Sequence, residues 1–371
     1  VVGGAKIKDY KGPQNQVQFP VQQLEEGETK RTLKNEHLGR KVDKVLHLED
    51  PYLADYSIDD FPRLKRLKTR RFSLKPAICV ERARLLTAYH REHGFETDSE
   101  GTPIDPNIRQ AGAMHHIMSQ RRPVIHDDYL LAGSTTTTEA GVPIYPEFIG
   151  LTIWPELRTM GNRDLNPNDI APEDADILNF EVFPFWMDRN VREYCRTKYG
   201  NPVSQQLEER FVLYFMMKNN AISHTVPDFP KIVSCGLDNI REQAVRLKEA
   251  TSEADKRNFY DAVKLSIDGV LAYAANLSQE AQRMADALDP AVPEQAQRMA
   301  ELKEMAGICA KVPARPAESV HEALMAIWIS FVCLHVENAN SALSIGRLDQ
   351  MLQPLFLKDM AKAQSDQERD A

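Results

Sequence analysis

Cysteine is in short supply, and the few cysteines that occur are scattered along the 371 residues. No two of them have C-x-x-C spacing, so the sequence indicates neither a zinc site nor a redox dithiol. An odd, unclustered count is typical of the reducing cytoplasm, which is the localisation we expect. Three lie in apolar helical patterns and are expected to be inert core thiols, namely Cys79, Cys309 and Cys333.

The chain also lacks an excess of positive charge and a long apolar run. Its 46 Lys and Arg residues are outnumbered by 54 Asp and Glu residues, which gives a net charge of −8. Nucleic-acid binding needs basic patches that neutralise phosphates, so no nucleic-acid partner is expected. No apolar run approaches the ~18 residues of a membrane span, so no membrane partner is expected either.

Several familiar catalytic signatures are missing. The sequence has no GxxxxGK[ST], GxGxxG, HExxH or GxSxG motif, which gives no support to a P-loop site, a dinucleotide site, a zinc protease or a serine hydrolase. No ligand spacing suits a metal ion, so we predict no metal site. The one pair worth weighing is His224 with Asp228, because an imidazole beside a carboxylate can orient a hydroxyl or amine. Spacing alone favours a structural hydrogen bond for these residues.

What the sequence does contain is a succession of helical patterns. Hydrophobic residues make up 42% and charged residues 27%, which fits a globular chain. Residues 1–60 are polar and irregular and are expected to form an extended arm. Apolar residues then recur at helical spacing, which predicts a mainly α fold. The expected helices cover residues 63–71, 77–93, 107–120, 209–218, 232–250, 255–288, 294–311, 318–338 and 347–360, the last interrupted at Pro354. Residues 124–131 are expected to form a short strand or an extended segment with an Asp-Asp turn.

The chain changes character at residues 335–350. An apolar helix, Ala323–Val336, gives way to a polar stretch, and a new helical segment opens at Arg347. Gly346 would let the backbone turn sharply before that segment. The apolar helix is expected to be buried, so the polar groups after it need partners from protein, water or a ligand. Composition alone favours a helix–loop–helix joint with satisfied caps.

The segment Glu337–Gln350, which reads ENANSALSIGRLDQ, resembles a stretch of the glycyl radical enzymes, the pyruvate formate-lyase-like superfamily. The likeness is loose in the middle and close at the GRLDQ end. Other blocks resemble the family in the same order, and several ordered blocks are a specific signal. They are Arg63–Leu64 with Pro76–Thr87, Asp127–Gly133, Pro143–Phe148, Phe183–Trp186 and His224–Phe229. The resemblance covers about residues 60–360 and only the front part of a complete family member.

The resemblance implies a fold and a domain division. Residues 61–371 would be the helical N-terminal portion of the family's α/β barrel, which is built of two half-barrels, and few strands are expected. The C-terminal radical domain would be absent. The family stores its radical on a glycine in an RV[AS]G[YF] loop and abstracts hydrogen with a cysteine in a GCxE context. Neither motif occurs in these residues, so the chain alone is expected to be inactive.

The resemblance also implies site residues. A GH[TI]xxD[YF] stretch lines the substrate pocket of dehydrating and C–N-cleaving members. His224 and Asp228 match it, whereas Ser223 replaces the usual glycine and Pro227 precedes the Asp. The region of Asn340 and Ser341 resembles another wall of that pocket.

The function implied for the complete protein is a lyase that cleaves a C–O, C–C, C–N or C–S bond by thiyl-radical hydrogen abstraction. A dehydratase or decarboxylase is favoured. A pyruvate formate-lyase-like acyltransferase and a non-catalytic helical scaffold or assembly subunit are the alternatives. No cofactor would bind directly, because an S-adenosylmethionine iron–sulfur activating enzyme would install the radical. The expected partners are a small-molecule substrate, that activase and a second copy of the complete enzyme.

Overall fold

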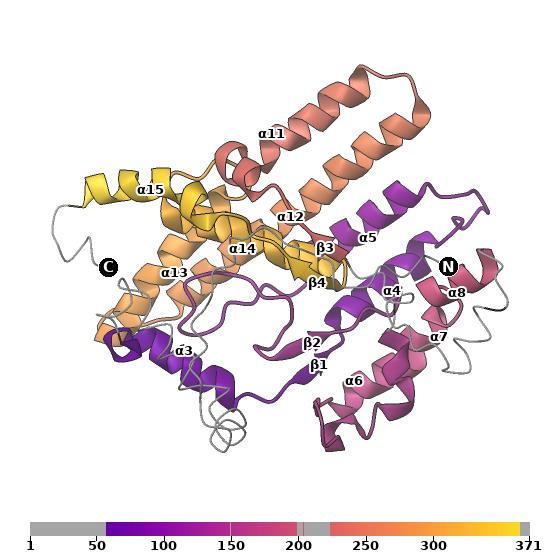
Figure 1. The fold of residues 1–371 in the computed structure, drawn as a ribbon, viewed down its shortest axis with the longest axis horizontal. Coiled ribbons are helices and arrows are strands. Elements are labelled where there is room, and N and C mark those ends of the chain that lie inside the picture. Colours follow the sequence, from indigo (N-terminus) through magenta and orange to yellow (C-terminus); the bar gives the residue numbers. More distant parts are fainter. Residues whose placement is uncertain (1–56, 149, 199–202, 204–222, 364–371) are drawn as a thin grey trace, which may run out of the picture. The chain divides into compact units, whose positions relative to one another are not determined.

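The structure is a computed structural model that describes residues 57–148, 150–198, 203 and 223–363 (Figure 1). Most of the predicted arm, residues 1–56, therefore lies outside the described residues. The chain divides into two compact units, Val1–Arg66 and Leu67–Ala371. This division falls within helix α3, Pro62–Ser73, and an arm that ends near residue 60 stays a prediction. In the first unit, Ser57 caps the short 3-10 helix Ile58–Asp60.

Helices dominate the second unit, as the sequence predicts. Beyond α3 they are α4 (Glu81–His93), α5 (Pro106–Gln120), α6 (Pro172–Ile177), α7 (Phe183–Trp186), α8 (Val191–Lys198), α11 (Phe229–Glu249), α12 (Ala254–Asp286), α13 (Pro293–Lys311), α14 (Val320–Glu337) and α15 (Leu348–Lys362). Shorter helical segments are 3-10 turns at Gly150–Glu156 and Met160–Asn162 and a π-helical turn at Leu178–Val182. The strands are β1 (Ala77–Cys79), β2 (Gly141–Pro143), β3 (Ser223–Thr225) and β4 (Asn340–Leu343).

The long helix α12 organises the core. Helices α5, α13 and α11 pack along it, and α11 and α12 lie side by side as a helical hairpin (Figure 1). Apolar residues recur every four positions on one face of α12, where Tyr273, Leu277 and Ala281 are fully buried. Burying a side chain such as Leu277 contributes about 1.5–3 kcal/mol. At Gly269 an added Cβ would lie 2.8 Å from the His115 Cα, so glycine permits the close approach of α5.

Helix α14 lies in this core. Its apolar residues contact both hydrophobic clusters of the second unit. By length and composition α14 could cross a membrane, and among the described helices it alone could. Half of its residues are buried inside the structure, however, which is how the core helix of a globular unit also behaves. The predicted burial of this apolar helix is confirmed.

The helix predicted at 209–218 lies outside the described residues. The other predicted helices are confirmed to within a few residues, with one exception. Residues 77–79 form strand β1 instead of the first turn of a helix, because they pair with a distant segment. The helix that follows begins at Glu81. At 124–131 no strand forms, and the predicted turn at Asp127 and Asp128 is confirmed. Pro354 does not interrupt α15. Cys79, Cys309 and Cys333 are buried as predicted, and burial raises the pKa of the Cys309 and Cys333 thiols to about 12.

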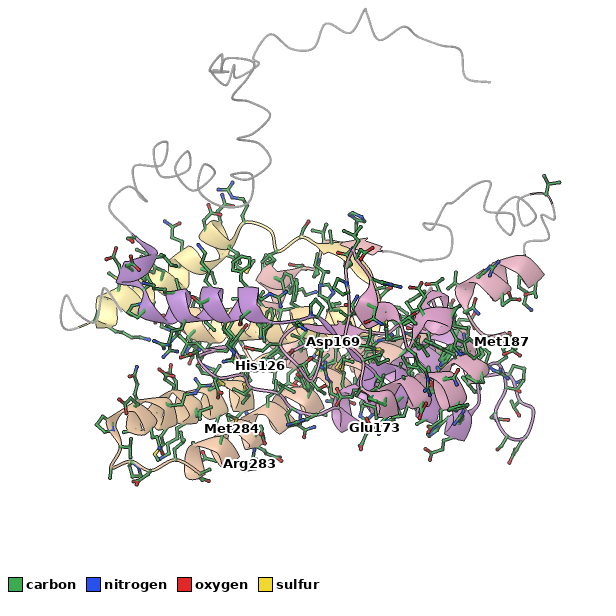
Figure 2. All side chains as sticks on the ribbon, turned by 90° about the horizontal axis from the view of Figure 1, so that it is seen from below. His126, Asp169, Glu173, Met187, Arg283 and Met284 are labelled. Carbon is green, nitrogen blue, oxygen red and sulfur yellow. The ribbon has the colours of Figure 1, made fainter. Side chains whose placement is uncertain are left out.

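The strands form two parallel pairs, each joining segments far apart in the sequence. β1 pairs with β2, with Ala77 opposite Gly141 and Cys79 opposite Pro143. Asp169, labelled in Figure 2, forms a further parallel bridge to Ala77 and accepts from the Ile78 N–H at 2.8 Å. β3 pairs with β4. The mainly α fold with few strands is therefore confirmed, and closure of a barrel stays a prediction.

Candidate functional site

Two segments that the sequence analysis singled out lie side by side. β3 pairs in parallel with β4, with Ser223 opposite Asn340 and His224 opposite Ala342. The backbone N–H of Ser344 donates to the Thr225 carbonyl at 3.0 Å and extends the pairing. The polar segment after α14 is thus a strand, so the helix–loop–helix joint favoured by composition is wrong. Its backbone groups find their partners in β3, more than a hundred residues earlier in the chain.

His224 and Asp228 flank the transition from β3 to α11. The His224 side chain is exposed. Asp228 is the N-cap of α11, where its Oδ1 accepts from the Lys231 N–H at 3.1 Å. Asp228 thus makes a structural hydrogen bond to the backbone of its own helix, and no hydrogen bond joins Asp228 to His224 among the described residues. The bond fixes the end of the loop at a helix N-terminus, where a carboxylate is also favoured by the helix dipole.

Asn340 and Ser341 belong to β4, so their backbone lies beside β3. Their side chains are outside the described residues. Gly346 has φ +85°, and it provides the sharp turn predicted before α15. Arg347 and Asp349 form an exposed ion pair at 2.6 Å, which anchors that turn.

The end of α14, immediately before β4, is held by side chains that the sequence analysis did not assign to the site. Arg82 donates through Nε to the Val336 carbonyl at 2.5 Å and through Nη2 to the Glu337 carbonyl at 3.1 Å. The Tyr145 hydroxyl donates to the His335 carbonyl. Arg82 and Tyr145 both fall within blocks that carry the family resemblance, which was the available signal.

Arg82 is buried and forms an ion pair with the partly buried Glu147. Its guanidinium binds both carboxylate oxygens of Glu147, with 3.1 Å between Nη1 and Oε2. It also donates to the Ile144 carbonyl at 3.3 Å and lies 4.1 Å from the centroid of the Tyr145 ring. Burial raises the pKa of the Tyr145 hydroxyl, against a smaller opposing effect of Arg82, so this hydroxyl stays protonated as a donor.

A cavity of about 230 Å³ lies beside the same helix end. Pro227 and Glu337 line it, together with mainly apolar residues of α5, α11, α12 and α14. Burial raises the pKa of the Glu337 carboxyl, and nearby Arg82 works in the opposite direction. His224 and Asp228 do not line this cavity. Their predicted convergence on one substrate pocket therefore stays a prediction.

No group of three or more His, Cys, Asp or Glu side chains in the described part of the chain is placed to hold a metal ion. His224 lies on β3 and Asp228 follows it, and an imidazole and a carboxylate are side chains that can form hydrogen bonds.

Comparison with known proteins identifies relatives over most of the chain. Residues 55–369 match the family model described as pyruvate formate lyase-like. The isethionate sulfite-lyase of Nitratidesulfovibrio vulgaris is 28% identical over 343 residues, which cover 88% of this chain and 39% of that protein. The trans-4-hydroxy-L-proline dehydratase of Clostridioides difficile is 27% identical over 319 residues, which cover 83% of this chain and 38% of that protein.

A solved structure shares the fold. The crystal structure of a glycyl radical enzyme from Archaeoglobus fulgidus has a TM-score of 0.69 at 30% identity, and the match covers 80% of this chain and 37% of that one. The chain thus spans about two fifths of the length of the curated relatives it matches.

Proposed function

Since the chain belongs to the pyruvate formate lyase-like family of glycyl radical enzymes, we propose that the complete protein is a radical lyase acting on a small organic molecule. It cleaves a C–O, C–C, C–N or C–S bond of its substrate. The names of the relatives, a sulfite-lyase and a dehydratase, support a lyase over an acyltransferase. The observation that carries the proposal is the pairing of β3 with β4, which sets the His224 segment beside the Asn340 segment.

In this proposal the chain holds the substrate while a radical formed elsewhere in the protein acts on it. A stored glycyl radical supplies the hydrogen abstraction, and an S-adenosylmethionine iron–sulfur activase installs it. The residues of this chain supply orientation and exclude water. The complete enzyme is a cytoplasmic homodimer in this view, and free cysteines such as Cys79 and Cys333 fit the reducing compartment.

His224 and Asp228 have separate tasks. The His224 imidazole can give or take a proton at a substrate hydroxyl or amine. Asp228 is anchored through Oδ1, and Oδ2 accepts no hydrogen bond within the described residues. That oxygen is available to accept from the substrate. Pro227 restricts the loop before α11 and Pro230 lies in the first turn of that helix, which suits a site that must hold a substrate in one orientation. Asn340 and Ser341 form the opposite wall.

The test is His224→Ala in the full-length protein. After anaerobic activation, turnover of isethionate, trans-4-hydroxy-L-proline and related small hydroxylated or aminated molecules is compared with that of the unsubstituted enzyme. We expect turnover of the accepted substrate to fall by at least ~10²-fold, the low end for losing a positioned proton-transfer group. The glycyl radical signal in the electron paramagnetic resonance spectrum should be unchanged, because the radical is stored elsewhere.

His93→Ala is the matched control, since His93 is an exposed histidine on α4. Unchanged turnover in His224→Ala would remove His224 from the site. A full-length protein that forms no radical under any activation condition would instead favour the scaffold alternative.

A further inference from the structure

The last carbonyls of α14 accept hydrogen bonds from side chains that are distant in the sequence. The final carbonyls of a helix have no partner within the helix and are ordinarily satisfied by water or a capping turn. Here the carbonyls of His335, Val336 and Glu337 each accept from a side chain of another segment. The donors are Tyr145 and Arg82, which lie 190 to 255 positions away in the sequence.

Arg82, one of the two donors, is itself held in place by an ion pair. The Arg82 side chain is 4% exposed and the Glu147 side chain 18% exposed, so their ion pair is largely shielded from solvent. The planar guanidinium uses its fork on the Glu147 carboxylate and its remaining N–H groups on carbonyls. A lysine carries the same charge but cannot make this planar set of bonds.

Arg82 and the carbonyls that accept its hydrogen bonds lie next to the ends of three strands. Arg82 itself follows β1 by three residues, and its carbonyl partner Ile144 directly follows β2. Its partners on α14 precede β4 by only a few residues. One buried guanidinium therefore connects the β1–β2 pair to the start of β4, which in turn pairs with β3.

We propose that Arg82 and Tyr145 are positioning residues that fix where α14 ends and so hold β4 in register with β3. Only Asn338 and Ala339 separate the held carbonyls from β4. A shift of the helix end therefore moves the strand that carries Asn340 and Ser341 relative to His224. The catalytic consequence rests on the proposed function, because displacement of about 1 Å in a substrate-holding wall can cost ~10²-fold in rate.

The first experiment measures backbone hydrogen exchange in the full-length protein and does not depend on activity. Arg82→Lys retains the charge and loses the fork, whereas Tyr145→Phe removes one hydroxyl and keeps the ring under Arg82. We expect amide exchange of residues 338–344 to accelerate by at least ~10-fold in Arg82→Lys and by less in Tyr145→Phe. Exchange in α12 and α13 should not change. Arg84→Lys, an exposed arginine on the same helix, is the control.

Two exchange results would overturn the proposal. One is exchange at 338–344 equal to that of the control in both variants. The other is equally faster exchange in α12 and α13, which would mark a general loss of fold.

The second experiment compares kinetics after activation. A positioning role predicts that Arg82→Lys lowers kcat by at least ~10-fold, with a smaller change in KM and unchanged radical content per chain. A merely structural role would lower radical content and turnover together, which would count against the proposal. If the unsubstituted enzyme neither forms a radical nor turns over a substrate, the proposed function fails, and hydrogen exchange still decides whether Arg82 and Tyr145 hold β4.

Discussion

The Ser330 hydroxyl is buried on α14 and has no hydrogen-bond partner within the described residues. A buried polar group without a partner costs about 1–3 kcal/mol relative to its hydrated state. We therefore expect Ser330→Ala to raise the unfolding free energy of the full-length protein by up to about 1 kcal/mol, visible as a higher Tm. Ser278→Ala is the control, because Ser278 donates to the Ala306 carbonyl at 2.8 Å and its loss should lower the Tm. A lower Tm in both variants would show that Ser330 has a partner.

His90 makes stability depend on pH. Its imidazole contacts the rings of Phe95 and Trp186, and burial lowers its pKa from 6.5 to about 4. Between these values the unfolded chain binds a proton that the folded chain does not, so stability falls as the pH drops from 6.5 towards 4. The full difference corresponds to about 3 kcal/mol, lost by the time the pH is below 4.

The expected result is a shallower loss of Tm between about pH 7 and pH 4 in His90→Gln than in the unsubstituted protein. His93→Gln, an exposed position one turn further along α4, should retain the original slope. Thermal unfolding followed by circular dichroism over this pH series measures both. Parallel slopes in His90→Gln and the unsubstituted protein would mean that the His90 imidazole titrates normally in the folded state.

At the scale of elements, the sequence predicts helices, whose apolar pattern is local, and misses short strands that pair with distant segments. Long helices such as α12 and α13 carry a repeating apolar face over many turns, so periodicity finds them. β1 has only three residues and joins directly to the pattern of α4. Its identity as a strand comes from hydrogen bonds to β2 and Asp169, which no window around residue 78 contains.

Of the two interpretations of residues 124–131, the strand is wrong for a related reason. Its apolar residues fit a strand, but side chains of other helices take the carbonyls that a neighbouring strand would need. Arg298 donates to the carbonyls of Tyr129 at 2.9 Å and His126 at 3.2 Å. The Nε2 atom of His321 lies 3.0 Å from the carbonyl oxygen of Leu130. These carbonyls thus have partners without a sheet, and the sequence gives no local sign of those partners.

The candidate site was likewise predictable only in part. Family resemblance identified the His224 and Asn340 segments, and the structure brings their backbones together in β3 and β4. The Arg82–Glu147 pair was missed because Arg82 binds carbonyls at the end of α14, a segment far from Arg82 in the sequence. Arginine is rarely buried, so an arginine near the start of a helix is also expected to be an ordinary surface residue.

At the scale of the whole molecule, the proposed function gives the described residues the task of holding the substrate. The candidate wall at β3 and β4 is a two-stranded pair, with His224 exposed on it. A pocket that holds a substrate away from water needs further walls, and the curated relatives are more than twice as long as the matched region. Under the proposed function, the radical therefore comes from a part of the complete protein that the match to the relatives does not cover.

The proposed function gives a prediction for the polypeptide of residues 1–371 produced alone. Neither an RV[AS]G[YF] segment nor a GCxE segment occurs in it, so it has no residue in the context that stores or relays the radical. Incubated anaerobically with an activase, S-adenosylmethionine and a reductant, it should give no glycyl doublet in the electron paramagnetic resonance spectrum and no turnover. Its circular dichroism should still be strongly helical, because α5, α12, α13 and α14 bury their apolar faces against one another. A full-length protein that carries both motifs is the positive control under the same conditions. A glycyl doublet from residues 1–371 would mean that one of their own glycines stores the radical, and the assignment of this chain as the substrate-holding part of the enzyme would then be wrong.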